Sequence, residues 1–136
     1  MEAPPSAAGA TSVAKYFLQL LPYVNATGDL SDWTALSHVD CLFCASVTKD
    51  VQAQTADGTH DEGGAIAIAD LGATEVTPSA YYQVDASLMQ AASQTIDGSG
   101  AVVESFPPTA AQVSVAVVWD GRAYSIRGVQ THPVGQ

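Results

Sequence analysis

The chain has 136 residues, 47% of them apolar, and is long enough to form one domain with a substantial core. Acidic residues outnumber basic ones by 14 to 4, and the net charge of −10 repels nucleic acid and anionic lipid surfaces. No stretch of about 18 apolar residues is present, so no membrane-spanning helix is expected. Only 13% of the residues are charged, a composition that we associate with exported rather than cytosolic proteins.

The first ten residues are rich in Pro, Ala, Ser and Gly. Residues 1–10 are therefore expected to form a flexible linker, since they lack the basic start and apolar centre of a signal peptide. We interpret them as the inner part of a linker whose targeting segment lies upstream. The folded domain is predicted over residues 11–130, and residues 131–136 are predicted to be a frayed tail.

The first helix is predicted to begin at a cap formed by Thr11-Ser12 and to end near Gly28. Pro22 removes one backbone donor from its last turns. Its apolar positions follow the helical period and are Val13, Phe17, Leu20, Leu21 and Val24.

Two further helices are predicted before the chain changes character. A short one surrounds Trp33, and a longer one is expected to begin with a cap at Asp40 and to stop before Asp57-Gly58. The inward face of the longer helix is expected to carry Cys44, Val47, Val51 and Gln54.

Beyond a polar, flexible loop predicted over residues 59–64, the hydrophobic period becomes that of strands. Residues 65–77 favour a strand that Gly72 weakens or bends through a bulge. The next strand should bury alternate side chains, namely Tyr82, Val84, Ala86 and Leu88.

The last strands are connected by turns with strong sequence signals. Residues 97–100 turn the chain into a strand that Pro107-Pro108 ends, because proline cannot serve a central ladder. A valine-rich strand then runs to Trp119, and Asp120-Gly121 predicts a hairpin into a strand that ends at Val129. Helices followed by hairpin-linked strands predict an α+β domain, with three N-terminal helices on one face of a curved antiparallel sheet of four to five strands.

Cys41 and Cys44 are the only cysteines. An even number in an exported chain favours a disulfide between them, which would close a very short loop. A redox-active pair is an alternative, since a helix N-terminus activates a thiol, although such pairs follow a strand. A zinc site is another, with His38 as third ligand and His60 or His132 as fourth.

Acidic residues gather near a glycine-rich segment at Asp57, Asp61 and Glu62. Their spacing does not fit the calcium-binding loop, in which oxygen ligands alternate before a distant Glu. We expect a solvated loop there, and neither a metal nor a cofactor in the domain.

Several segments are similar to those of a known group of proteins. They are Lys15-Tyr16-Phe17-Leu18, Tyr23-Val24-Asn25-Ala26-Thr27-Gly28-Asp29, Leu36-Ser37 and Cys41-Leu42-Phe43-Cys44, and more weakly Val102-Val103-Glu104 and Val118-Trp119-Asp120. The sequence thereby resembles a family of uncharacterised actinobacterial lipoproteins of unknown function. This resemblance implies a domain similar to the nuclear transport factor 2-like cone, carried on a linker from a lipid-modified cysteine. It implies no activity and no catalytic residues.

A cone of this kind can enclose a pocket between its helices and its sheet. The expected lining residues are Tyr16, Phe17, Trp33, Phe43, Tyr82 and Trp119, with Asp40, Asp85 or His38 as polar groups. Some proteins of that fold are isomerases or hydratases that hold an Asp or His base in an apolar cavity. No pair of acid and base is defined by this sequence, and the same aromatic residues equally suit a packed core.

We therefore expect an extracytoplasmic, lipid-anchored domain that binds a small ligand or a cell-envelope protein and is not catalytic. Membrane contact is expected only through the anchor, nucleic acid is not expected as a partner, and a homodimer is compatible with the sequence. The alternative is a cone-fold enzyme, isomerase- or hydratase-like, that acts on a small apolar substrate. Such an enzyme needs a titratable group inside a cavity, and a binding domain does not.

Overall fold

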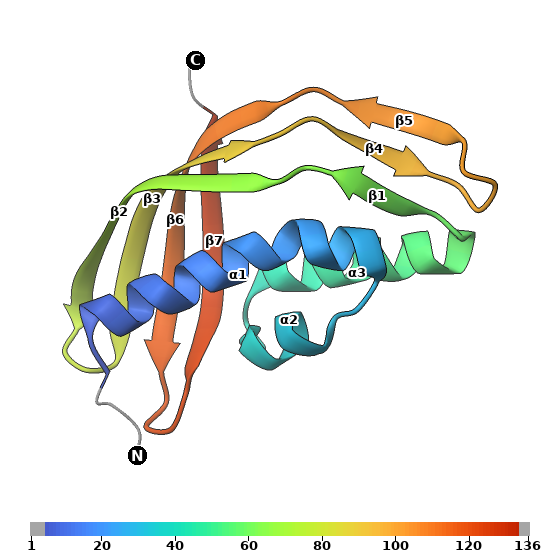
Figure 1. The fold of residues 1–136 in the computed structure, drawn as a ribbon. Coiled ribbons are helices and arrows are strands. Elements are labelled where there is room, and N and C mark those ends of the chain that lie inside the picture. Colours follow the sequence, from blue (N-terminus) through green and yellow to red (C-terminus); the bar gives the residue numbers. More distant parts are fainter. Residues whose placement is uncertain (1–4, 134–136) are drawn as a thin grey trace.

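The computed structural model describes residues 5–133, which fold as three helices followed by seven strands. The helices are α1 (Ala7–Thr27), α2 (Ser31–Leu36) and α3 (Leu42–Asp57). The strands are β1 (His60–Gly63), β2 (Ile66–Thr77), β3 (Tyr81–Gln90), β4 (Ser93–Ile96), β5 (Val102–Phe106), β6 (Thr109–Trp119) and β7 (Tyr124–Pro133). Figure 1 shows the strands arching over α1 and α3, which confirms the predicted α+β fold with helices on one side of a curved antiparallel sheet.

The curvature comes from a break that crosses the sheet. Strands β2, β3, β6 and β7 form a four-stranded part, while β1, β4 and β5 form a three-stranded part. In the three-stranded part β1 continues the line of β2, β4 that of β3, and β5 that of β6. Backbone pairing crosses the break, because Gly64 N–H donates to Ala92 O at 3.0 Å and Ala91 N–H to Ala65 O at 2.9 Å. The same break separates β5 from β6 at Pro107-Pro108, since proline has no N–H to donate to the neighbouring strand.

The predicted flexible loop over residues 59–64 is wrong for most of its length. His60 to Gly63 form β1, which pairs with the equally unexpected strand β4. The Thr95 hydroxyl donates to Asp61 Oδ1 at 2.7 Å across this pair. These polar residues form a strand because β4 supplies a ladder partner 30 or more residues away, which local composition does not reveal.

Both predicted domain boundaries need correction. Helix α1 begins at Ala7, within the expected linker, because Ser6 caps it by accepting Gly9 N–H at 3.0 Å. Thr11 is not a cap, and its hydroxyl donates to Ala7 O at 2.8 Å inside the helix. At the other end β7 extends to Pro133, so residues 131–133 are strand rather than frayed tail. The remaining linker and tail residues, 1–4 and 134–136, lie outside the described residues.

The core lies between α1 and the concave face of the sheet. The predicted alternation in β3 is confirmed: Tyr82, Val84 and Ala86 are buried, and Leu88 packs against them. Helix α1 contributes Phe17, Leu20 and Val24 as predicted, and β6 contributes Val113, Val115 and Val117. None of the helices in the described part of the chain is long and apolar enough to span a membrane.

The turn between β4 and β5 carries a testable electrostatic feature. The Asp97 carboxylate accepts the Ser99 hydroxyl at 2.6 Å and the N–H groups of Ser99 and Ala101 at 2.9 and 3.0 Å. These bonds, that of the Ser99 hydroxyl first, lower the pKa of Asp97 below its usual range. Its carboxylate therefore contributes stability above its unfolded pKa, and the contribution is lost as the pH falls through the lower folded pKa.

We expect Asp97→Asn to lower the midpoint of urea unfolding at pH 7, and the deficit to shrink as the pH approaches 2. Unfolding curves of the variant and the wild type across this range measure the effect. The exposed helical residue Asp50 supplies the matched control, Asp50→Asn, which should shift the midpoint little at any pH. A constant deficit for Asp97→Asn from pH 7 to pH 2 would contradict the assignment.

Candidate functional site

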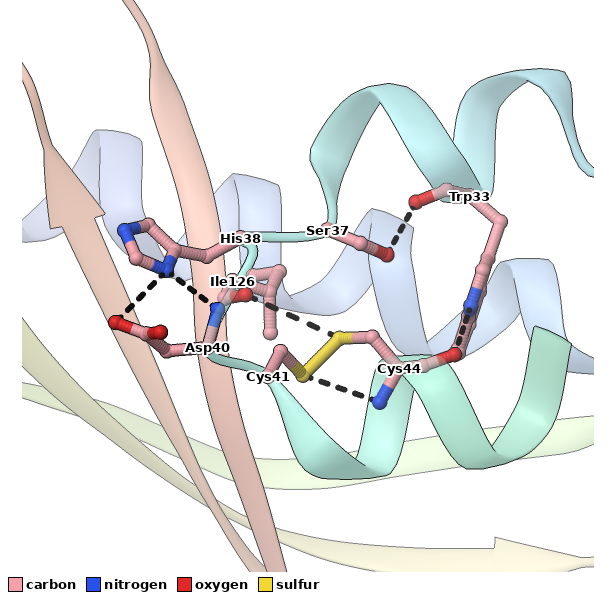
Figure 2. Close-up of a disulfide and its surroundings, with 7 residues drawn as sticks. All are labelled: Trp33, Ser37, His38, Asp40, Cys41, Cys44 and Ile126. Carbon is pink, nitrogen blue, oxygen red and sulfur yellow. Dashed lines mark hydrogen bonds and ion pairs between the residues drawn. A yellow bond between two sulfur atoms is a disulfide. The ribbon is translucent and has the colours of Figure 1, made fainter. Parts of the chain in front are cut away.

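The paired cysteines begin α3 and are buried. Cys41 and Cys44 form a disulfide with 5.2 Å between their Cα atoms, and their side chains are only 2% and 1% exposed (Figure 2). Cys41, rather than the predicted Asp40, occupies the N-cap, where its Sγ accepts the Cys44 N–H at 3.1 Å. Cys44 Sγ lies 3.9 Å from the carbonyl oxygen of Ile126 in β7. The disulfide therefore fixes the helix start against the sheet.

The segment before the disulfide is attached to the same strand. His38 N–H donates to Ile126 O at 2.8 Å, and Ser37 forms a parallel bridge with Ile126. His38 Nδ1 accepts the Asp40 N–H at 3.0 Å and lies 3.8 Å from Asp40 Oδ2 (Figure 2). The Asp40 carboxylate is at the surface, 3.9 Å from the Arg127 guanidinium. Because Asp40 and Arg127 are more than half exposed, this ion pair adds little stability.

Trp33 of α2 links the disulfide to the core. Its indole N–H donates to Cys44 O at 3.1 Å, and its ring stacks on that of Phe17 with centroids 4.0 Å apart (Figure 2 shows the indole bond). The centroid of the Phe43 ring lies 6.2 Å from that of Trp33, with the two planes tilted by 45°. The disulfide, the indole and α1 therefore form one packed unit.

This environment does not suit redox exchange or metal binding by the cysteines. Thiol exchange needs an accessible sulfur, and both sulfurs are covered. A zinc ligand must be a thiolate, whereas these sulfurs are bonded to each other. The proposed fourth ligands lie elsewhere, His60 in β1 and His132 in β7. Within residues 5–133 no three His, Cys, Asp or Glu side chains are close enough to hold a metal ion.

Four of the predicted pocket residues belong to the packed interior. Phe17, Trp33 and Tyr82 are fully buried, and Phe43 is half-buried against Trp33. The Tyr82 hydroxyl donates to Glu75 at 3.1 Å; burial, and secondarily this bond, raises the pKa of Tyr82. These rings form part of the packed space between helices and sheet.

The other three predicted residues lie at separate surfaces. Tyr16 is half-exposed, donates to Asp32 Oδ2 at 2.8 Å and lines a groove of about 390 Å³ between α1 and α2. Asp85 is exposed on the outer face of the sheet, where it accepts the Ser114 hydroxyl at 2.6 Å. Trp119 packs edge-on against Tyr124 with ring centroids 4.9 Å apart, beside the β6–β7 hairpin.

The acidic residues considered for calcium do not form one ligand set: two have separate partners, and the third lies at the surface. Asp61 is bonded to Thr95, and Glu62 Oε2 lies 2.9 Å from His60 Nε2 on the same strand. Asp57 ends α3 at the surface.

A second pocket was not anticipated from the sequence. It has a volume of about 320 Å³ and lies between the C-terminal turns of α1 and α3 and the start of β1. Its walls come from three segments that are distant in the chain and that no local pattern connects. The helix-ending Gly28 is part of the lining, and Gly58 comes directly before the lining residue Thr59.

A family of unknown function, DUF6318, matches residues 3–130, which is nearly the whole chain. The chain belongs to this family. Among curated proteins none matches the sequence.

Solved structures with the same arrangement place the DUF6318 domain in a known fold class. The intermembrane-space region of the chloroplast protein ARC6 aligns with a TM-score of 0.70 and 10% identity, over 96% of this chain and 99% of that one. An uncharacterised Caulobacter vibrioides protein with a cystatin-like fold aligns at 0.58 with 11% identity, over 93% and 91%. Aln2 from a Streptomyces species aligns at 0.57 with 11% identity, over 96% and 94%. At these identities the likeness supports the cystatin-like and nuclear transport factor 2-like fold and says nothing of activity.

Proposed function

We propose that this DUF6318 domain is an extracytoplasmic binding domain, held at the cell envelope of an actinobacterium by a lipid anchor upstream. The observation that carries the proposal is the buried disulfide, because such bonds persist in exported proteins and are rare in the reducing cytosol. The low charged fraction of 13% supports the same compartment.

Binding is favoured over catalysis by the position of the titratable groups. Asp40 and Asp85, the acids that a cone-fold enzyme would use, are both exposed. No charged residue of the described chain is buried, so the interior offers no base whose pKa an apolar cavity could tune. The partner is a small ligand or an envelope protein, and the net charge of −10 disfavours nucleic acid.

Expression of the full-length protein in an actinobacterial host tests the location. We expect it in the membrane fraction, labelled by radioactive palmitate and degraded by protease added to intact cells. The protein should leave the membrane fraction in detergent and not in high salt, because acyl chains rather than charges hold it there. Recovery in the cytosolic fraction without palmitate would contradict the proposal.

A further inference from the structure

The helix-end pocket, between the last turns of α1 and α3 and the start of β1, is built by specific backbone features. Gly28 ends α1 in the left-handed conformation (φ 74°) and passes so close to α3 that a Cβ there would lie 3.0 Å from Thr55 Oγ1. Gly58 ends α3 in the same way, and Thr59 N–H then donates to Gln54 O at 2.9 Å. The walls are therefore held by helix caps rather than by mobile loops.

The polar wall of this pocket is made of amide, hydroxyl and imidazole groups. Its polar side chains are Asn25, Thr27, Gln54, Thr55, Thr59 and His60, and none of the described residues that line it is Lys, Arg, Asp or Glu. Two helix C-termini border it, and their partial negative charge opposes an anion. The protein's net charge of −10 also disfavours an anion. A cation would gain from these ends, yet the lining offers neither a carboxylate nor an aromatic face to hold it.

One wall residue has an unused hydrogen-bonding group. The Gln54 Oε1 atom is buried and has no partner within the described structure. Buried polar atoms are paired in most proteins because an unpaired one costs about 1–3 kcal/mol. Rotation of the amide about its last side-chain torsion would present this oxygen to a donor in the pocket. Asn25 on the opposite wall, an amide on α1, can both donate and accept.

We propose that the helix-end pocket binds a small, neutral, polyhydroxylated molecule of the monosaccharide or polyol class. Hydroxyl groups supply the donor that Gln54 lacks and also accept from the amides, and the volume lies at the lower end of the range for ligand pockets. A lining of amides, hydroxyls and apolar groups, without Lys, Arg, Asp or Glu, matches a neutral ring better than an ion. This inference names the ligand class of the proposed binding domain and rests on that function.

The test uses the ¹⁵N-labelled domain titrated with D-glucose, D-mannose and myo-inositol. We expect at least one probe to shift the amide resonances of Gly28, Thr59 and His60 in a saturable way, with millimolar affinity. Glucose 6-phosphate should bind at least about tenfold more weakly than the neutral probe, because the helix C-termini and the net charge of the protein oppose an anion.

Two variants each remove one amide from the polar wall, and a third variant serves as the control. Gln54→Leu and Asn25→Leu should each weaken binding at least about tenfold, the loss expected for one buried hydrogen bond. Gln52→Leu changes an exposed glutamine of the same helix and should leave the affinity unchanged. Resonances outside the pocket verify folding of each variant.

The proposal is overturned if none of the three neutral probes shifts the pocket resonances, or if a charged probe binds as tightly. Equal affinities of Gln54→Leu, Asn25→Leu and Gln52→Leu would also overturn it. A failure of these titrations leaves the palmitate and protease results untouched, so the ligand class and the extracytoplasmic function can fail separately.

Discussion

Replacing Trp33 by Ala is expected to lower the free energy of unfolding by about 3–5 kcal/mol, the largest effect of any single substitution considered for this domain. The indole is fully buried, stacks on Phe17 at 4.0 Å and donates to Cys44 O at 3.1 Å. Its removal leaves a cavity at the point where α1, α2 and the start of α3 meet, and takes the hydrogen bond with it. Urea unfolding followed by circular dichroism measures the loss.

Two matched variants separate packing from hydrogen bonding. Trp33→Phe keeps a stacked ring and loses the indole N–H, so its cost should be about 1–3 kcal/mol. Trp119→Ala removes the other tryptophan, which is only half-buried beside Tyr124, and should cost clearly less than Trp33→Ala. If the two tryptophans are equally costly to remove, Trp33 does not hold the helices together as described.

Loss of the disulfide is expected to cost about 2 kcal/mol, the amount that the chain-entropy model gives for so short a loop. The double variant Cys41→Ala/Cys44→Ala removes the bond without leaving a free thiol. It should still fold, because the aromatic cluster around Trp33 and the attachment of His38 to β7 do not depend on the sulfurs. Its urea midpoint should fall by the amount that corresponds to this cost.

The reductant supplies the internal control for this prediction. Dithiothreitol should lower the midpoint of the wild type to near that of the double variant and leave the double variant unchanged. A double variant as stable as the oxidised wild type would show that the bond has no structural role.

Local signals were sufficient where neighbouring residues determine the structure. The alternation from Tyr82 to Leu88 describes a strand with one buried face, and the Asp120-Gly121 pair forms a turn in which the Asp120 carboxylate accepts two N–H groups at 2.8 and 2.9 Å. The inward face of α3 likewise follows from its period, with Cys44 and Val51 buried. In each case the residues that define the element are adjacent in the chain.

The misjudged features depend on partners far along the chain. Strand β1 is polar and exists because it pairs with β4, and Ser6 begins α1 where its N–H also donates to the Tyr124 hydroxyl at 3.0 Å. The predicted pocket residues are dispersed for a related reason: sequence spacing does not reveal whether aromatic side chains such as Phe17 fill a space or line it. The helix-end pocket is likewise assembled from the ends of two helices and a strand.

The central expectation for this domain is a location where disulfides persist, and the thiol state in living cells tests this location directly. Intact actinobacterial cells that make the full-length protein are treated with a membrane-permeant alkylating reagent, and the domain is then examined by mass spectrometry. We predict that Cys41 and Cys44 are unlabelled, lack their thiol hydrogens, and become reactive only after reduction under denaturing conditions. Recovery of the domain with both cysteines already alkylated would contradict an extracytoplasmic, disulfide-bonded domain.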